Sequence, residues 1–251
     1  MEIVLASNIQ VGNSVYVCRS RLPTLPDQGK AFYQSTVVSK NHRSIAIMMP
    51  NGTHSALIAT KFAHHRVGIA IIVFGDFASE YTLLNPLAKT ILQYCRLLFG
   101  DDDYVTLFKI RSLAELSCLC ESRSFHPFEH IVVIGHGSIS GEIGAAVECI
   151  DVGMAIEQFE KNSPQAWDFT FLCCYLGRQV FAKKFSLSGC CKSMIAPFNS
   201  VHGAVSAQFV QTYLIKTLLE GETTAIAHRH ASESTPPKSA FRLWRNGKHI
   251  A

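Results

Sequence analysis

Three continuously apolar runs of strand length constrain the fold of this chain more than any other feature. They are GIAIIVFG at 68–75, HIVVIGHG at 130–137 and DFTFLCCYLG at 168–177. Strands that are apolar along their whole length are typical of a parallel sheet covered by helices on both faces. Amphipathic segments of helix length alternate with these runs, which is the pattern of an α/β fold. From about Gly68 onwards the sequence therefore predicts a mostly parallel sheet.

The remaining segments of this region complete the predicted sheet and its helices. Asn85 and Pro86 offer an N-cap and a first-turn proline for a helix that ends before Gly100. An apolar stripe at helical spacing predicts a long helix from about 203 to 220, closed by Gly221. The other expected elements are a strand at 104–110, a helix at 112–121, a helix at 176–185, a strand at 192–198 and an edge strand at 241–244.

Residues 1–66 have a different texture, because short runs with period-two alternation replace the continuous apolar ones. These runs lie at 13–18, 31–39 and 44–49, and Pro, Gly and Asn separate them. Alternation of this kind predicts half-buried strands. We expect a small antiparallel barrel or meander of about five strands, which resembles an SH3-like barrel. The sequence thus predicts two domains, 1–66 and 67–251.

The basic character of the chain belongs to its first part. Of the net charge of +4, residues 1–66 contribute seven Lys or Arg against two acidic residues, which leaves the rest slightly acidic. Such an imbalance fits a surface for an acidic or nucleic-acid partner, and it equally fits solvated basic loops on a small domain. The sequence leaves both interpretations open.

The cysteine count and the start of the chain bear on the compartment. Nine cysteines, an odd number scattered through apolar segments, do not form the pattern of a disulfide framework. No apolar run approaches the roughly 20 residues of a membrane span, and the start MEIVLASNIQ lacks the basic region of a signal peptide. We therefore expect reduced thiols and a cytoplasmic location.

Two of the apolar runs end at residues that are capable of catalysis. His136 precedes Gly137 at the end of one run, and Cys173 and Cys174 stand at the end of another. A thiolate is the nucleophilic form of cysteine, and a neighbouring imidazole can take its proton and later return it to a leaving group. The pair therefore indicates nucleophilic cysteine catalysis.

Together these residues resemble the caspase-like fold of clan CD cysteine peptidases, in which one strand ends in His-Gly and a later one in a small residue followed by Cys. The CHAT-type domains are the most similar members. Their Cys-x-x-Gly matches Cys174 to Gly177, and their next strand, turn and long helix are similar to 194–198 and the helix that ends at Gly221. The resemblance also includes a short helix at 227–231 and covers about residues 67–250, without the first domain.

The resemblance implies a mechanism for hydrolysis of a peptide or protein substrate. Cys174 would attack the peptide carbonyl and form a thioester, and His136 would supply acid-base help. The N–H groups of Gly137 and Cys174 would form the oxyanion hole, while Cys173 would point into the core. No cofactor and no metal are implied. Because many caspase-like enzymes stay inactive until a partner or dimer assembles the groove, we expect regulation by a partner or by assembly.

The first substrate pocket carries no clear charge in the sequence. Relatives that prefer Arg or Lys have a carboxylate just before the nucleophile or after the next strand, where this chain has Leu172 and Asn199. We expect the pocket to be lined by Asn199, Phe198 and His202, with Asp76 reaching it from the exit loop of the first strand. An aspartate preference would instead need arginines, for which the candidates are Arg178 and Arg66.

Two alternatives to a peptidase remain. One is a soft metal site made from Cys118, Cys120, Cys190, Cys191 and His126, although adjacent and x-separated pairs fit tetrahedral zinc poorly. The other is a non-catalytic caspase-like scaffold, whose basic first domain binds a protein or nucleic-acid partner.

Overall fold

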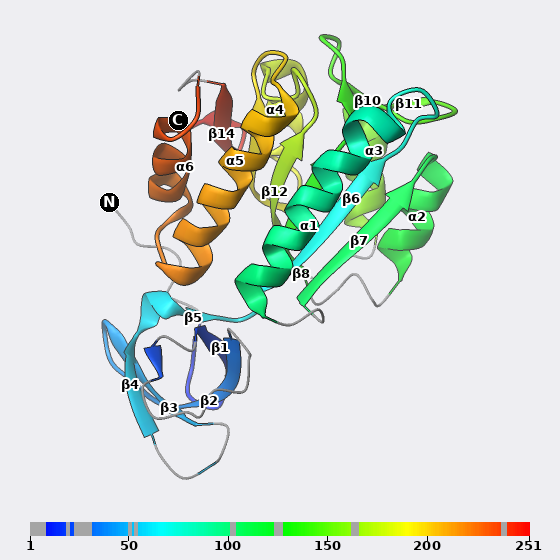
Figure 1. Ribbon diagram of the computed structural model, residues 1–251. Helices are drawn as coiled ribbons and strands as arrows, with labels where there is room; N and C mark the ends of the chain where they lie inside the picture. Colours follow the sequence, from blue (N-terminus) through cyan, green and yellow to red (C-terminus); the bar gives the residue numbers. More distant parts are fainter. Residues whose placement is uncertain are drawn as a thin grey trace.

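The protein consists of a small all-β unit and a larger α/β unit (Figure 1). The computed structural model describes residues 9–18, 21–22, 32–49, 52, 55–100, 104–122, 128–161, 166–236 and 240–251. In the view of Figure 1 the small unit lies below the amino ends of the large sheet, and its last strand leads directly into the first strand of the α/β unit.

The small unit is a five-stranded antiparallel sheet with a hydrophobic core of its own. Its strands have the order β4-β3-β2-β1-β5. Alternating buried residues such as Val15, Val17, Ile45 and Ile47 fill the core, as period-two patterning predicts. The bounds are β1 (Ser14–Cys18), β2 (Phe32–Lys40), β3 (Ser44–Met48), β4 (Ser55–Ala59) and β5 (Ala63–His64). Between these strands, residues 23–31, 50–51 and 53–54 lie outside the described residues.

The large unit is built on a seven-stranded mixed sheet with the order β15-β14-β13-β12-β8-β6-β7. Five neighbouring strands are parallel: β7, β6, β8, β12 and β13. Strands β14 and β15 add an antiparallel edge. The chain reverses its direction of winding between β6 and β8, which creates a topological switch point there. The bounds are β6 (Gly68–Phe74), β7 (Val105–Ile110), β8 (Phe128–Ile134), β12 (Trp167–Leu172), β13 (Cys191–Pro197), β14 (Phe241–Arg245) and β15 (Lys248–His249).

Helices cover both faces of this sheet, so the α/β unit is a three-layer sandwich. One apolar core lies between the sheet and α1, α5 and α6, and a second lies between the sheet and α2, α3 and α4. Successive residues of the central strands alternate between these cores, because strand side chains point to opposite faces. The bounds are α1 (Asn85–Phe99), α2 (Leu113–Glu121), α3 (Val152–Glu160), α4 (Gln179–Phe185), α5 (Gly203–Leu214) and α6 (Thr224–Glu233).

Three features of the large unit differ from the sequence-based expectations. A π-helical turn at Glu80–Leu84 runs directly into α1, so Asn85 is inside a longer helical segment and is not its N-cap. Helix α5 likewise continues into a π-helical turn, Ile215–Leu219, before Gly221. A small sheet was not predicted; it consists of β9 (His136–Gly137), β10 (Glu142–Gly144) and β11 (Cys149–Asp151).

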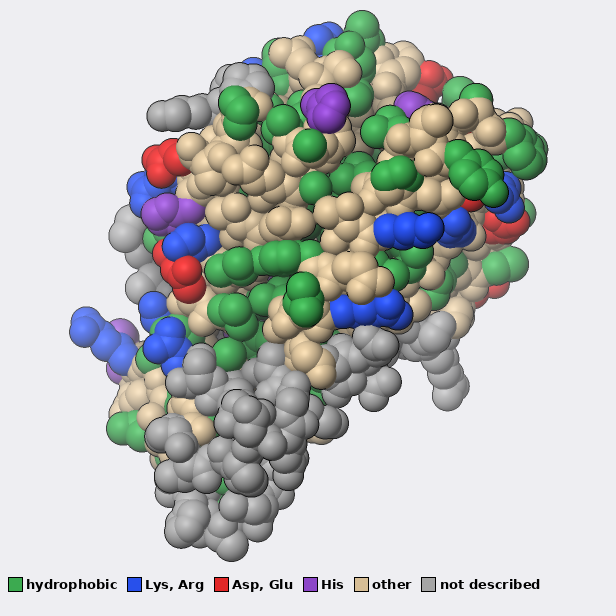
Figure 2. Space-filling model, in the orientation of Figure 1, with side chains coloured by type: hydrophobic (Ala, Val, Ile, Leu, Met, Phe, Trp, Pro, Cys, Tyr) green, Lys and Arg blue, Asp and Glu red, His purple; other side chains and the backbone are tan. Residues whose placement is uncertain are grey.

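The surface in Figure 2, which is the face formed by α1 and α5, has apolar and basic side chains interspersed over it. Within the described part of the chain, no helix has both the length and the apolar character that crossing a membrane requires.

Candidate active site

His136 and Cys174 follow two adjacent strands at the centre of the sheet. Strands β8 and β12 are parallel, and Ile134 pairs with Leu172. His136 and Cys174 each lie two residues beyond that pair, so both follow strand ends at the same edge of the sheet, His136 after β8 and Cys174 after β12. This edge holds the carboxyl ends of the parallel strands, beside the switch point between β6 and β8, where open α/β sheets bind their ligands.

Gly137 packs directly against the peptide bond that joins the two cysteines. A Cβ atom at this position would overlap the carbonyl oxygen of Cys174 and lie 3.0 Å from its backbone nitrogen. Only glycine lets the two backbones approach this closely. Glycine at position 137 therefore has a steric reason. Because His136 precedes Gly137 in the chain, the same contact brings the backbone of His136 close to that of Cys174.

A tight turn after β12 exposes Cys174. Tyr175 has φ of 68°, a left-handed conformation that costs a residue with a Cβ roughly 1–2 kcal/mol. Gly177 then packs against the backbone of Ala196 and Pro197, and its N–H donates to the Pro197 carbonyl at 2.7 Å. Trp244 Nε1 donates to the carbonyl of Gly177 at 3.0 Å. The strained turn is thus held by neighbouring strands, as is common at functional sites.

The two adjacent cysteines have opposite environments. Cys173 is fully buried in the apolar core, and its burial raises the pKa of its thiol. Cys174 is partly exposed. A buried thiol with a raised pKa is a poor nucleophile, so the structure agrees with the expectation that Cys173 points into the core and that Cys174 is the accessible member of the pair.

The imidazole of His136 contacts the exit loop of β6. Its Nε2 lies 2.6 Å from Ser79 Oγ and 3.2 Å from Asp76 Oδ2. The Ser79 hydroxyl donates to the same carboxylate oxygen at 2.6 Å. Because the hydroxyl has a single proton and gives it to Asp76, Nε2 of His136 is the donor toward Ser79, so in the neutral imidazole Nδ1 is the acceptor.

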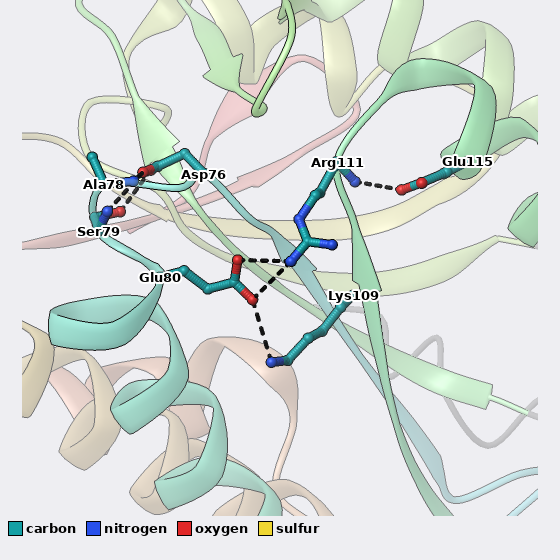
Figure 3. Close-up of polar contacts among 7 residues, drawn as sticks. All are labelled: Asp76, Ala78, Ser79, Glu80, Lys109, Arg111 and Glu115. Carbon is teal, nitrogen blue, oxygen red and sulfur yellow. Dashed lines mark hydrogen bonds and ion pairs between the residues drawn. The ribbon is translucent and has the colours of Figure 1, made fainter.

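The exit loop is held by two sets of polar contacts, drawn in Figure 3. Asp76 Oδ1 accepts the N–H groups of Ala78 and Ser79, both at 2.7 Å. The hydrogen bonds from the Ser79 hydroxyl and backbone are the main reason that the pKa of Asp76 is lowered. The turn therefore keeps a negative charge beside His136.

Glu80 attaches the same loop to the neighbouring strand β7. Its carboxylate binds Arg111 at 3.0 Å and Lys109 at 3.4 Å (Figure 3). The pKa of Glu80 is lowered, chiefly by the hydrogen bond from Arg111. The side chains of Arg111 and Lys109 are about half exposed, so we regard these pairs as a means of orienting the loop more than as a source of stability.

The thiol of Cys174 points toward the loop after β13. Its Sγ donates to Ser200 Oγ at 3.5 Å. Among the described residues, no hydrogen bond joins Cys174 to His136. Catalytic contacts are often long or misaligned before substrate binds.

The residues expected to line the substrate pocket occupy the same loop. Asn199 Oδ1 accepts from Arg178 at 3.2 Å, and the ring of Phe198 contacts the guanidinium groups of Arg178 and Arg242. His202 is exposed and caps α5 by accepting the N–H of Ala204 at 3.2 Å. Asp76, by contrast, directs its carboxylate to Ser79 and His136.

Of the two arginines considered for an aspartate preference, only Arg178 lies near Cys174. Its Nε donates to the Phe198 carbonyl at 3.1 Å. Arg66 pairs with Glu129 at 3.1 Å, next to the amino end of β8. The strand places Arg66 at the opposite edge of the sheet from His136, so its candidacy for this pocket was wrong.

The soft metal site finds no support among the described residues, which contain no group of three or more Cys, His, Asp or Glu side chains placed to hold a metal ion. His126, which the alternative requires, lies outside the described residues.

Sequence reasoning missed Ser79, Ser200 and the contact between Asp76 and His136. The spacing of Asp76 and Ser79 before a helical turn is an Asx-type signal that would have predicted the local turn. It would not have predicted that the turn faces His136, because that depends on the order of strands in the sheet. Nothing in the sequence singles out Ser200.

No protein-family model matches the chain, and no curated protein matches it. Solved structures do. The chain is similar to a secreted C11 cysteine protease from Bacteroides thetaiotaomicron in complex with an irreversible peptide inhibitor, with a TM-score of 0.51 and 8% identity, over 72% of this chain and 66% of that one. A second structure of a secreted C11 cysteine protease from that organism, named iotapain, has a TM-score of 0.44 and 10% identity, over 72% and 67% of the two chains.

The chain thus spans slightly less than two thirds of the protease structure with the higher TM-score. At this identity the likeness concerns the fold alone: the chain has a mixed α/β fold like that of this C11 cysteine protease.

Proposed function

We propose that the protein is a cysteine endopeptidase that uses His136 and Cys174 as its catalytic dyad. The observation that carries the proposal is the placement of these two residues after adjacent parallel strands, at the carboxyl edge of a sheet whose fold is that of C11 cysteine proteases. Cys173 is buried, so the thiol of Cys174 is the available nucleophile.

In the proposed reaction, Nδ1 of His136 removes the proton of Cys174, and the thiolate attacks the peptide carbonyl. His136 then returns the proton to the departing amine, which leaves a thioester that water hydrolyses. The N–H groups of Gly137 and Cys174 stabilise the oxyanion, a contribution of about 10²–10³ in rate for one such donor elsewhere. Asp76 and Ser79 orient the imidazole and support its positive charge, as the third member of a catalytic triad does.

The contacts of Phe198 and Asn199 support a pocket for the residue before the scissile bond, with His202 at its margin and Arg178 beside it. The orientation of Asp76 toward His136 supports a role as an orienting group in preference to a pocket carboxylate.

The proposal includes regulation by a partner or by assembly. The thiol of Cys174 supports this, because it donates to Ser200 and, among the described residues, forms no hydrogen bond with His136. We also keep the closer assignment to CHAT-type domains, which rests on the Cys174 to Gly177 turn and on the helix that ends at Gly221, whose φ is 65°.

For residues 1–66 we propose a separate SH3-like domain that binds a partner. The strand order with β1 between β2 and β5, and the 3-10 turn Thr60–Phe62 before β5, support that comparison. A cytoplasmic location is supported by the cysteines, all nine of which are free thiols.

Thiol labelling and peptide cleavage test the proposal together. Iodoacetamide at neutral pH should label Cys174 faster than Cys118 and Cys149, which are exposed thiols and serve as internal controls. Cys174→Ala and His136→Ala should each abolish cleavage of a mixed peptide library, with circular dichroism checking the fold, whereas Cys118→Ala should not. Ser79→Ala should lower kcat/KM by roughly tenfold or more, because the imidazole loses its orienting partner, and Ser79→Thr should restore part of it.

Cleavage that persists in both dyad variants would remove the peptidase assignment. Equal labelling of all three thiols, with no cleavage under any condition, would favour the non-catalytic scaffold.

A further inference from the structure

A cavity of about 700 Å³ lies between the two units, at the edge of the sheet opposite to His136 and Cys174. Its walls come from the end of the small unit, from the amino ends of β8, β12 and β13, from the 221–224 loop before α6, and from the turn after β14. Seven-residue strands are about 20 Å long, so this cavity is separate from the candidate active site. Its volume lies within the range of small-molecule sites, about 300–1,000 Å³.

The floor of the cavity is a chain of ion pairs that neutralise one another. Arg66 binds Glu129 at 3.1 Å, and Lys192 binds Glu129 at 2.7 Å and Asp168 at 3.0 Å. Ser193 Oγ donates to the remaining oxygen of Asp168 at 2.5 Å. Two cations and two carboxylates are thus satisfied within the protein, which makes this floor a scaffold and not the group that recognises a ligand.

Three other wall residues have buried polar atoms without a hydrogen-bond partner among the described residues: Thr60 Oγ1, His64 Nε2 and Glu222 Oε2, the last of which lies 3.7 Å from His230 Nε2. Thr60 is only 3% exposed. Burial keeps His64 neutral by lowering its pKa to about 4. Because Nε2 has no partner in the described part of the chain, the hydrogen bond of the imidazole to the Leu218 backbone is made by Nδ1–H, which leaves Nε2 as an acceptor. A buried polar atom without a partner costs about 1–3 kcal/mol, and three around one cavity indicate a site for a ligand that donates hydrogen bonds.

The same walls carry two cations, Lys61 and Arg245, that form no ion pair with a carboxylate in the described part of the chain. Lys61 Nζ lies 4.6 Å from the centre of the Phe62 ring, a contact that leaves its charge available to an anion. The cavity therefore presents positive charge for an anionic group and, within the same space, acceptors for N–H groups.

We propose that this cavity binds a small organic anion of nucleotide size that also carries amine or amide N–H donors. Lys61 and Arg245 bind the phosphate or carboxylate, and Glu222, His64 and Thr60 bind the N–H groups. Two sources have this chemistry, a nucleotide with an amino-substituted base and a short acidic peptide. The cavity volume fits a ligand of nucleotide size and exceeds what a single amino acid would fill.

Calorimetric titration of the wild-type protein tests the proposal, and it requires no peptidase activity. The probes are GMP and AMP, the tripeptide Ala-Ala-Glu, and ribose 5-phosphate, which has the phosphate without N–H donors. We expect saturable binding of GMP or AMP at least about tenfold tighter than that of ribose 5-phosphate, since charge-assisted hydrogen bonds contribute at this level. Tight binding of the tripeptide alone would support the same site chemistry with the peptide as its source.

Variants then locate the binding. Arg245→Gln and Glu222→Gln should each weaken it by about tenfold, and Thr60→Val, which keeps the shape of the side chain, should weaken it less. Lys89→Gln, an exposed position on α1, should leave it unchanged. The proposal is overturned if no probe binds saturably to the folded protein, if ribose 5-phosphate binds as tightly as the nucleotides, or if the wall variants bind like the wild type.

Discussion

Gly137 fixes how closely the two candidate catalytic residues can approach. Its Cα faces the peptide bond between Cys173 and Cys174 with no room for a Cβ. The histidine and the thiol thus depend on a neighbour that has no reactive group. At the scale of single residues, the geometry of the proposed dyad is set as much by this missing side chain as by His136 and Cys174 themselves.

Gly137→Ala should therefore lower peptidase activity by roughly 10²-fold, because a displacement of about 1 Å in a catalytic group has effects of that size. It should also destabilise the fold by about 1–3 kcal/mol through overpacking. Gly144→Ala is the matched control, since a Cβ there meets the Cβ of His136 at 3.5 Å, an ordinary contact. Initial rates on one peptide and urea unfolding measure both effects. Equal activity in the two variants would contradict the steric argument.

The resemblance to caspase-like peptidases implied the choice of Cys174 over Cys173, because its Cys-x-x-Gly matches Cys174 to Gly177 and a small residue precedes its nucleophile. The structure agrees, with Cys173 fully buried. Ser79 was not predictable, since its contact with His136 joins positions 57 residues apart through the sheet. Local patterns predict which residues follow the end of a strand, but they do not predict which loop those residues contact.

At the scale of elements, α6 and β14 are joined through a buried histidine. His228 is 3% exposed, and its Nε2 donates to the Phe241 carbonyl at 3.2 Å. Burial is the main cause that lowers its pKa to about 4, against a smaller opposing effect of the hydrogen bond. The folded protein therefore keeps this histidine neutral in mildly acidic solution, where the unfolded chain protonates it.

The free energy of unfolding should fall as the pH decreases from about 6.5 toward 4, by up to about 1.4 kcal/mol per pH unit from His228. The sign follows because the unfolded state binds the proton more readily in this interval. His228→Gln keeps a donor for Phe241 and does not titrate, so its stability should depend less on pH. Urea unfolding at several pH values compares the slopes, with pH 8 as the baseline. Parallel curves for both proteins would disprove the assignment.

Most elements of the large unit were predictable because their patterns are strong. The continuous apolar runs correspond to β6, β8 and β12, and the Ser112 N-cap accepts from Glu115 at the predicted start of α2. The start of the first helix was misplaced, because Asn85-Pro86 resembles a helix start although the π-helical turn before it continues the same axis. The sheet formed by β9, β10 and β11 escaped prediction, since strands of two or three residues have no measurable period.

At the scale of the whole molecule, a network of partly buried charges extends from the end of the small unit into the large sheet. Arg66, at the end of the small unit, forms an ion pair with Glu129. Lys192 pairs with both Glu129 and Asp168. Burial opposes the charge on Lys192, but Asp168 and Glu129 outweigh it and raise the pKa of the amine. For Asp168, burial is likewise outweighed by Lys192 and His130, and its pKa is lowered.

Lys192→Met should destabilise the protein by about 3–5 kcal/mol, because it leaves Asp168 and Glu129 without their shared cation. The double variant Lys192→Met with Asp168→Asn should recover part of the loss. Lys183→Met, an exposed position on α4, is the control and should change stability by less than about 0.5 kcal/mol. Thermal and urea unfolding provide the comparison. A Lys192→Met variant as stable as the control would show that the shared cation does not stabilise the large sheet.

The arrangement of the two units was beyond what the sequence allowed. The change of texture near Gly68 predicted a boundary, but no local pattern predicts that Arg66 and Glu129 meet across it. The cavity between the units was unpredictable for the same reason, because its walls come from segments as distant in the sequence as Thr60 and Arg245.

The alignment of His136 with Cys174 across β8 and β12 has a consequence for how the core tolerates substitution. Backbone hydrogen bonds between parallel strands fix this alignment, and they do not depend on which apolar residues fill the core. Apolar residues of the core can then be exchanged while the two positions stay opposite each other. Substitutions in β8 and β12 that conserve apolar volume should therefore leave the placement of His136 and Cys174 unchanged.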